Sequence, residues 1–569
     1  MKNLVYCILV LSIISCSKKD SNKSFDTYKN NFVEGLWKLN PDWAASQGYH
    51  KYDSVLIVPD AKNRKINIDF ALSNLDSLKK YSLETLNDNN KTDFYMIKNQ
   101  LESTAFYANE YKSYEWNPAE YNVCGAFAEI LNGKYDSLDN RLRNFNLKLK
   151  NVPAFYKAAA NNIKNPTFEH TALARDQNLG GLSVFEIDLK EAVAKSKLST
   201  DEKGQIIANA KAASKSIADY VEFLKTTPTR AAGDFRLGNE VYAKKFNLDI
   251  QSSYTSDQML EKAVAHKKDL HQKMFDLSEK LWAKYLKNAA KPADKLTQIK
   301  QVIDEISKQH TTPEKFQTEI EKQIPELTAF VKSKNLLYID PSKPLVVRKE
   351  PSYMAGVAGA SISAPGPYDK TANTYYNVGS MAGWSAEKSE SYLREYNDYI
   401  LQILNIHEAI PGHYTQLVYS NQSPSIIKSI FGNGAMIEGW AVYTEKMMLE
   451  NGYKNSDEMM LMYYKWNLRS TCNTILDISV HTKNMSKKEA LDLLSNQAFQ
   501  QQAEADGKWN RVTLTQVQLC SYFTGYTEIY EFREMLKKSD KNFDLKKFHE
   551  KFLSFGSTPV KYIKELYVK

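Results

Sequence analysis

The chain has 569 residues, of which 43% are apolar and 25% charged, and its formal net charge is +8. This composition is typical of an ordinary soluble globular protein, and the length fits either one large domain or several smaller ones. Positive and negative residues alternate along the chain and form no basic block, so we predict no nucleic-acid partner.

The first 24 residues predict export and lipid attachment. Lys2 precedes an apolar run at residues 4–11 that is too short to span a bilayer and has the form of a signal peptide, residues 1–15. Residues 13–16, IISC, look like a bacterial lipobox, in which Cys16 would be lipidated. Residues 16–24 would then be this cysteine and a polar tether, which attaches the protein to the cell envelope, with Ser17 favouring the outer membrane. The alternative is a plain signal peptide with an incidental cysteine.

Helical patterning dominates the rest of the sequence. Residues 201–225, 260–288 and 312–334 place apolar side chains three and four positions apart among lysines and glutamates. Residues 345–347 and 374–378 have the β-branched and aromatic content of short strands, and helical patterning returns at Ser385. We therefore predict a mainly α fold, with one large helical domain over residues 25–569. Its helical N-terminal part would be residues 25–335, and residues 336–569 would hold a small strand element and the active-site helices.

The segment HEAIPGH at residues 407–413 carries the strongest functional signal. In the familiar His-Glu-x-x-His zinc motif the histidines lie four positions apart on one helix face. His407 and His413 are six apart, which on an ideal helix would separate the rings by about 120° and about 9 Å. Pro411 excludes a regular helix here and Gly412 supplies a permissive backbone. We therefore predict a local bulge of two extra residues that returns His413 to the metal face.

Nearby carboxylates complete the inventory of a catalytic zinc site. Glu408 is placed to act as general base on a metal-bound water, and Glu438 supplies a third ligand beside His407 and His413. Glu445 lies two turns beyond Glu438 on the same helix face, where it can accept a hydrogen bond from a ligand imidazole. Without Glu438, an ordinary helix-end turn would be a serious competing interpretation. Zinc is the expected cofactor, and other divalent ions also suit this ligand set.

These motifs resemble those of the bacterial family called domain of unknown function 885, which is grouped with the gluzincin-like metallopeptidases. Residues 407–413 with Gln416 look like its first signature, and residues 438–445 look like its second. Residues 39–53, 477–483, 511–525 and 548–559 resemble further blocks, so the likeness covers almost the whole mature chain. It implies an oligopeptidase-like fold and does not imply a substrate. The chain departs from the family pattern at Val512 and at residues 516–517.

Peptide hydrolysis also needs a donor for the developing oxyanion. Tyr522 and His481 are the candidates, and Asp477, four residues before His481, is placed to orient its ring. A hydrogen-bonded core tyrosine is the alternative for Tyr522. We expect Gln416 to support the ligands from behind, together with Asp477 and Glu445.

Substrate binding is predicted at three positions. Arg469 and Arg511 are candidates for bidentate binding of a substrate carboxylate, with buried structural salt bridges as the alternative. The strand at residues 374–378, with Tyr376, is expected to pair as an edge strand with an extended substrate backbone.

The sequence thus favours a lipid-anchored zinc metallopeptidase whose partners are a peptide substrate and, through its lipid, the membrane. Two alternatives stay open: a zinc amidohydrolase acting on non-peptide or cell-wall amides, and a lipoprotein that binds peptides without turnover. The oligomeric state is not predicted.

Overall fold

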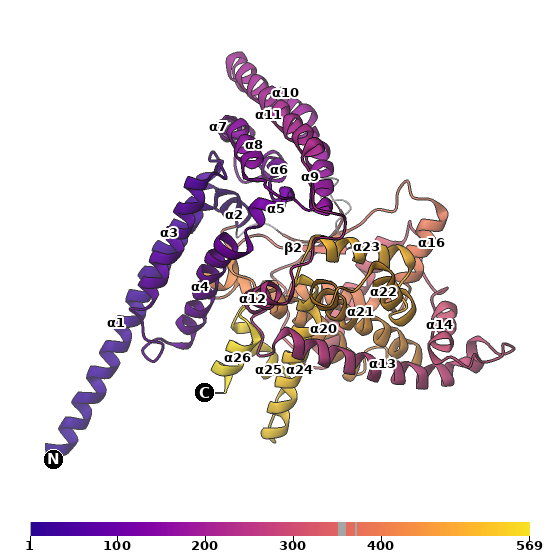
Figure 1. Cartoon of the computed structure of the whole chain (residues 1–569). Helices are drawn as coiled ribbons and strands as arrows, with labels where there is room; N and C mark the ends of the chain where they lie inside the picture. The colour runs from indigo at the N-terminus through magenta and orange to yellow at the C-terminus, as the bar shows by residue number, and fades with distance from the viewer. Residues whose placement is uncertain (1, 351–359, 370–372, 569) are drawn as a thin grey trace. The chain divides into compact units, whose positions relative to one another are not determined.

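Helices make up most of the chain, in the computed structural model that describes residues 2–350, 360–369 and 373–568. The residues group into two compact units (Figure 1). The first holds residues 1–235 and 366–370, and the second holds residues 236–365 and 371–569. The mainly helical fold with a small strand element is confirmed.

The first unit is entirely helical in its described part. Phe127 packs at its centre against Phe145, with ring centroids 4.6 Å apart, and against Phe185 at 5.1 Å. Its α-helices are α1 Lys2–Leu39, α2 Pro41–Ser46, α3 Ala61–Leu78, α4 Asp88–Phe106, α5 Ser113–Trp116, α6 Cys124–Asn132, α7 Leu138–Leu149, α8 Val152–Asn162, α9 Phe168–Gly181, α10 Leu189–Lys195 and α11 Thr200–Thr226. Short 3₁₀ or π turns are η1 His50–Tyr52, η2 Tyr107–Tyr111, η3 Pro118–Glu120 and η4 Val184–Asp188.

The predicted polar tether is part of helix α1 in this structure. Ser21 Oγ lies 3.0 Å from Thr85 Oγ1, and Asn22 donates to the Thr85 carbonyl at 3.2 Å. These contacts hold the segment against the α3–α4 connection, so residues 21–24 belong to the folded unit and are no free spacer. The signal-peptide prediction and Cys16 fall on residues 1–20, whose side chains lie outside the described part of the structure.

The second unit carries the predicted site. Its α-helices are α12 Asn239–Asp249, α13 Ser256–Tyr285, α14 Lys295–Ile306, α15 Phe316–Ser333, α16 Ala386–Glu395, α17 Ile400–Glu408, α18 His413–Asn421, α19 Ile426–Ile430, α20 Gly434–Glu450, α21 Asp457–Thr482, α22 Lys487–Leu491, α23 Gln502–Leu514, α24 Ser521–Ser539, α25 Leu545–Ser554 and α26 Val560–Tyr567. Two short turns, η6 Asp492–Gln497 and η7 Gln518–Cys520, join some of them.

The predicted helices α11 and α13 begin at side-chain caps. The side chains of Ser199 and Thr255 each accept a hydrogen bond from the backbone N–H of the third helical residue. The side chain of that residue accepts one from the backbone N–H of the cap residue, which completes a capping box. The stretch before the histidine motif, predicted as one helix, is interrupted between Glu395 and Ile400. There the Asn397 side chain accepts from two backbone N–H groups and caps the start of α17.

A three-stranded sheet lies in the second unit. Its strands are β1 Leu345–Lys349, β2 Ala360–Ser363 and β3 Thr374–Val378, in the order β1-β3-β2. Strand β3 runs parallel to β1 and antiparallel to β2, with Tyr376 opposite Val347 and Ile362. The predicted substrate-binding edge strand is therefore wrong, because β3 is the central strand and both of its edges are already paired.

The sheet is tied to the helix that carries the first histidine. The Tyr376 hydroxyl donates to Asn405 Oδ1 on α17 at 2.8 Å, and Asn405 in turn donates to Gln323 on α15 at 2.7 Å. Tyr376 is fully buried. It therefore positions α17 and cannot contact a substrate, which corrects its predicted role.

Candidate metal centre

His407 and His413 stand on two different helices. Helix α17 ends at Glu408, residues 409–412 form a turn, and α18 begins at His413. Pro411 has no N–H to continue the helix. At Gly412 the chain passes so close to α17 that an added Cβ would lie 1.9 Å from the His407 carbonyl oxygen. The predicted bulge within one helix is thus a full break, and a side chain at position 412 would not fit.

The break nevertheless brings the two rings together, as predicted. Their centroids are 4.7 Å apart and their planes are nearly perpendicular. Glu438 on α20 approaches both rings: its Oε2 atom lies 3.3 Å from His413 Nε2 and 3.6 Å from His407 Nε2. Three potential ligand atoms from three helices therefore face a common point.

Glu445 holds the His407 ring in place. Its Oε1 atom lies 2.7 Å from His407 Nδ1 and also accepts a hydrogen bond from Trp466 Nε1 at 3.0 Å. Because Glu445 is fully buried and a carboxylate can only accept, His407 carries its proton on Nδ1. The Nε2 atom on the other side of the ring then faces Glu438, the orientation that the sequence predicts for a ligand imidazole.

Helix α20 is fixed by contacts of the two residues that follow Glu438. At Gly439 its backbone touches that of α24, since an added Cβ there would lie 2.3 Å from the Gly525 carbonyl carbon. On the next residue, Trp440 Nε1 donates to the Pro411 carbonyl at 2.9 Å, which secures the turn between α17 and α18. These two residues thus anchor the helix that carries Glu438 to the elements around the rings.

The charges of the cluster favour a cation at its centre. Burial opposes the charged form of His407, but hydrogen bonds to Glu438 and Glu445 raise the pKa of His407 to about 10. Burial likewise opposes ionisation of Glu438, but the positive charges of His413 and His407 hold the pKa of Glu438 well below its usual range. The carboxylates thus stabilise positive charge at the point where the ring nitrogens meet.

The residues present fit a zinc ion. Ligand atoms about 2.0–2.1 Å from a tetrahedral zinc lie about 3.3 Å from one another. The two separations between Glu438 Oε2 and the ring nitrogens, 3.3 and 3.6 Å, are close to this value. Glu438 Oε2 is buried, and its contacts with the two rings lack the geometry of a well-formed hydrogen bond. The oxygen therefore faces the two ring nitrogens and is open to a stronger partner such as a cation.

Glu408 borders the same point. Ligand atoms of Glu408, His407 and His413 all lie within 4.8 Å of one another. Glu438 Oε2 lies 3.3 and 3.6 Å from the ring nitrogens, so Glu438 is the candidate third ligand, with Glu408 beside it. Burial raises the pKa of Glu408, and the charges of His413, His407 and Arg469 partly oppose this rise. A carboxylate whose basicity is raised in this way is suited to accept a proton.

Tyr522 reaches the cluster from α24. Its ring lies 6.5 Å from that of His407, and its hydroxyl accepts a hydrogen bond from Arg511 at 3.3 Å. Burial, with the negative charge of Glu438, raises the pKa of Tyr522 to about 12, so the phenol keeps its proton. Tyr522 is therefore a hydrogen-bond donor beside the cluster, although the sequence around it departs from the family pattern.

His481 and Asp477 take structural roles instead of the predicted catalytic ones. His481 Nε2 lies 2.9 Å from the Val512 carbonyl oxygen, and its ring stacks on Tyr242. Asp477 accepts from the Tyr242 hydroxyl at 2.7 Å and from the backbone N–H of Val517 at 2.9 Å. Together they hold the turn before α24, and so act on Tyr522 only through the backbone.

Gln416 also differs from its prediction. Its Nε2 atom donates to Ser557 Oγ at 2.8 Å and so links α18 to the turn before α26. It therefore supports the helix that carries His413 and does not orient a ligand ring.

The two predicted substrate arginines have different surroundings. Arg469 on α21 forms an ion pair with Glu504 at 2.5 Å and lies over the ring of Trp466 at 4.7 Å. Arg511 on α23 is exposed and donates to Gln518 Oε1 at 2.6 Å as well as to Tyr522. Arg469 thus forms the salt bridge of the structural alternative, although the pair is not fully buried, whereas Arg511 is open to solvent.

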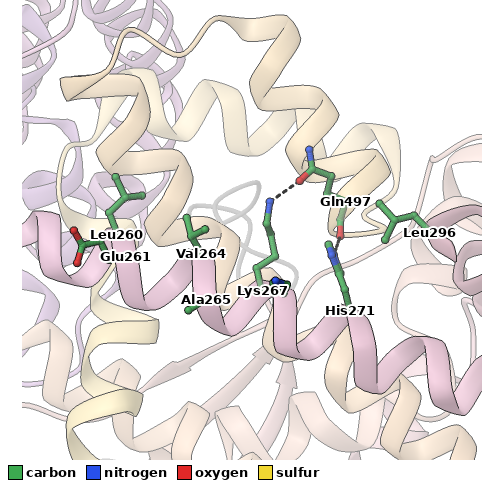
Figure 2. Close-up of a pocket in the computed structure, with 9 residues that line it drawn as sticks. Leu260, Glu261, Val264, Ala265, Lys267, His271, Leu296 and Gln497 are labelled. Atoms are coloured by element: carbon green, nitrogen blue, oxygen red, sulfur yellow. Dashed lines mark hydrogen bonds between the residues drawn. The ribbon is translucent and has the colours of Figure 1, made fainter. Parts of the chain in front are cut away.

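A cavity of about 550 Å³ runs along α13 and contains none of the predicted site residues. Figure 2 shows Lys267 and His271 there, both bonded to Gln497 on the opposite side. The surface that lines this cavity is largely apolar, so it presents few polar groups that could bind or activate a substrate. The metal cluster is the better candidate site.

Comparison with known proteins bears on the whole chain. The sequence profile of a family described as bacterial protein of unknown function, DUF885, matches residues 41–566. The chain belongs to the DUF885 family. A comparison with curated proteins finds no match.

Two solved structures resemble this DUF885 member. A candidate lipoprotein of unknown function from Shewanella oneidensis is 50% identical with a TM-score of 0.88, over 96% of this chain and 100% of that one. A candidate lipoprotein from Colwellia psychrerythraea is 17% identical with a TM-score of 0.78, over 96% of this chain and 98% of that one, and shows the fold alone. Within the part of this chain that the structure describes, no helix is both long and apolar enough to cross a membrane.

Sequence reasoning missed two tryptophans that organise the site. Trp440 bonds the Pro411 carbonyl and Trp466 bonds Glu445. Trp440 stands in the same family segment as Glu438, so the sequence could have marked it as part of the site. Trp466 gave none, because only the folded chain brings α21 beside α20.

Proposed function

We propose that this DUF885 member is a zinc metallopeptidase that hydrolyses peptides and is anchored to the cell envelope through a lipid on Cys16. The convergence of His407 Nε2, His413 Nε2 and Glu438 Oε2 on one point, with Glu408 beside it, carries the proposal. Two imidazoles, which bind a metal in their neutral form, a carboxylate and an adjacent carboxylate base are the inventory of a catalytic zinc site.

Each residue has a distinct task in this proposal. His407, His413 and Glu438 would hold the ion, and Glu445 keeps the His407 ring oriented. Zinc, when bound, polarises a carbonyl and lowers the pKa of water. Glu408 accepts the proton of the attacking water and can pass it to the leaving amine. The Tyr522 hydroxyl donates a hydrogen bond to the negative oxygen that develops on the substrate carbonyl.

The surroundings of Glu408 favour catalysis over binding alone. A binding protein has no need of a buried carboxylate whose pKa is raised beside a cationic centre. Glu438 and His413 are the more accessible ligands, with side chains 20% and 13% exposed, against 8% for His407. A substrate would therefore approach from the side of Glu438 and His413.

The anchor rests on different observations. Residues 13–16 look like a lipobox, and the 50% identical structure from Shewanella oneidensis is described as a candidate lipoprotein. Mass spectrometry of the membrane-extracted protein would test this: we expect an acylated Cys16 at the mature N-terminus. Detection of the intact N-terminus, or of unmodified Cys16, would refute the anchor.

The activity can be tested with metal analysis and one variant. We expect about one zinc per chain, and hydrolysis of a peptide library that stops on chelation and returns with zinc. Glu408→Gln should keep the metal and lose about 10²- to 10⁴-fold in kcat, whereas His407→Ala should lose the metal. Full activity of Glu408→Gln would exclude the proposed base. Cleavage of amides but of no peptide would favour the amidohydrolase instead.

A further inference from the structure

Two helices beside the metal centre bring an excess of positive charge together. Helix α21 presents Lys465 and Arg469 four residues apart, and helix α23 presents Glu504, Lys508 and Arg511 along one side. The helices meet through the Arg469–Glu504 ion pair at 2.5 Å and through Lys508 Nζ, which donates to Asn473 at 2.6 Å.

The cations outnumber the carboxylates in this cluster. Lys465 pairs with Glu395 at 2.9 Å and Arg469 pairs with Glu504. Lys508 and Arg511 hydrogen-bond only to neutral groups among the described residues. Four basic side chains thus face two carboxylates, which leaves Lys508 and Arg511 without an acidic hydrogen-bond partner among the described residues. Buried charge is costly unless it is paired.

Two side chains show an unmet demand for an anion. The Nη1 atom of Arg469 is buried and makes no hydrogen bond of normal geometry with a described residue, although the Tyr396 phenol interacts with the guanidinium. Lys508 is only 4% exposed. Burial, together with the charges of Arg469 and Arg511, lowers the pKa of Lys508 well below its usual range. An added carboxylate would restore the charged form.

The cluster adjoins the metal centre at both of its ends. Arg469 lies over Trp466, which bonds Glu445, which in turn bonds His407. Arg511 bonds Tyr522, whose ring lies near that of His407. Because Arg511 bonds Tyr522 directly, an extended substrate whose scissile bond lies beside Glu408 would place a neighbouring part against Arg511 and the basic side chains next to it.

We propose that Arg469, Lys508 and Arg511 form a subsite for a carboxylate of the substrate. This rests on the proposed peptide hydrolysis and names its substrate class: peptides that carry a negative charge close to the cleaved bond. The carboxylate is either the free C-terminus, which would make the enzyme act near peptide ends, or an acidic side chain. A planar guanidinium with a spare N–H group suits a carboxylate in either case.

Binding without turnover tests the subsite directly. We would titrate the full-length Glu408→Gln protein with N-acetylated trialanine as the free acid and as the carboxamide, by calorimetry. We expect the acid to bind at least about tenfold more tightly, as one charged hydrogen bond gained implies. A second pair, blocked peptides with an internal glutamate or glutamine, identifies the source: tighter binding of the glutamate peptide points to a side chain. Equal affinities within both pairs, or no binding at all, would overturn the proposal.

Variants locate the effect. Both variants are made in the Glu408→Gln background, and each should reduce the acid-to-amide preference several-fold. Arg511→Gln removes a positive charge, and Arg469→Lys removes the planar guanidinium that can bind a carboxylate through two N–H groups. Arg511 is exposed, so its variant should fold even if Arg469→Lys, which weakens the ion pair with Glu504, does not. Lys487→Gln removes an exposed cation that lies 4.0 Å from Asp506 on α23, and should leave the preference unchanged. A preference that survives Arg511→Gln and Arg469→Lys would also overturn the subsite.

The two proposals fail in different ways. If the wild-type protein cleaves no peptide while the acid preference persists, peptide hydrolysis is wrong and the carboxylate subsite stands. If peptides are cleaved with the same kcat/KM as acid and amide, with or without an internal glutamate, the hydrolase stands and the subsite is wrong.

Discussion

The Nδ1 atom of His407 lies 2.7 Å from the Oε1 atom of Glu445, a carboxylate that is fully buried two helical turns beyond Glu438. One helix, α20, therefore provides both the proposed ligand oxygen of Glu438 and the carboxylate that holds the His407 ring. The two functions are linked by the pitch of a single helix, which is why their spacing could be recognised in the sequence.

We predict that Glu445→Gln weakens metal binding. Glutamine keeps the shape of glutamate but removes the negative charge that holds the His407 ring, and loss of such a partner typically lowers metal affinity by about 10- to 100-fold. Competition with a coloured chelator would measure the change. Glu387→Gln, at an exposed position in the first turn of α16, is the matched control and should behave as wild type. An unchanged zinc affinity in Glu445→Gln would contradict the orienting role.

We predict that Tyr522→Phe lowers kcat by about 10²- to 10³-fold with little change in KM, because it removes one donor to the developing oxyanion. Steady-state kinetics on the best peptide would measure both constants. Tyr530→Phe, two turns further along α24, is the control. A rise in KM at constant kcat would show that Tyr522 binds the ground state instead.

We predict that Gly525→Ala destabilises the fold by at least about 1–3 kcal/mol, as overpacking of a tight contact does. An added Cβ at this position would lie 1.7 Å from the Ala435 carbonyl oxygen on α20. Urea unfolding would measure the loss. At Gly507, on the exposed side of α23, a Cβ meets nothing within 4 Å. Gly507→Ala should therefore be neutral or stabilising by up to about 1 kcal/mol. Equal effects of the two variants would disprove the close helix contact.

We predict that His549 makes the fold acid-sensitive. The Tyr443 hydroxyl donates to its Nε2 at 2.7 Å, while its Nδ1 donates to the Leu336 carbonyl at 2.8 Å, so the buried ring is neutral. Burial lowers the pKa of His549 to about 4. A histidine whose folded pKa lies below its unfolded value of about 6.5 contributes stability above that value, and the contribution is lost as the pH falls toward 4.

The corresponding measurement compares pH 7 with pH 5. Between unfolded and folded pKa values each pH unit costs about 1.4 kcal/mol, so His549 should account for about 2 kcal/mol of lost stability by pH 5. The pH dependence of urea unfolding should therefore be shallower by this amount in His549→Gln. The same slope in both proteins would show that this histidine does not titrate as proposed.

The sequence predicted the candidate ligand residues better than the residues and strands that surround them. The motif at residues 407–413 and Glu438 could be recognised because ligand chemistry depends on residue type and spacing. Strand β3 was found with the bounds it has, yet its central place in the sheet was not, since pairing depends on β2, which lies in a stretch rich in glycine and proline. The resemblance of residues 477–483 to a family block and the four-residue spacing suggested a catalytic role for His481 and an orienting role for Asp477. Only their contacts with Val512 and Tyr242 reveal that both are structural.

The backbone contact between Gly439 and Gly525 also bears on how the molecule can move. Two helices that touch without intervening side chains cannot slide or tilt past each other without collision, so α20 and α24 should behave as one rigid body. Glu438 and Tyr522 would then keep their separation throughout a reaction cycle. Any opening that admits a large ligand must therefore occur at other elements of the unit.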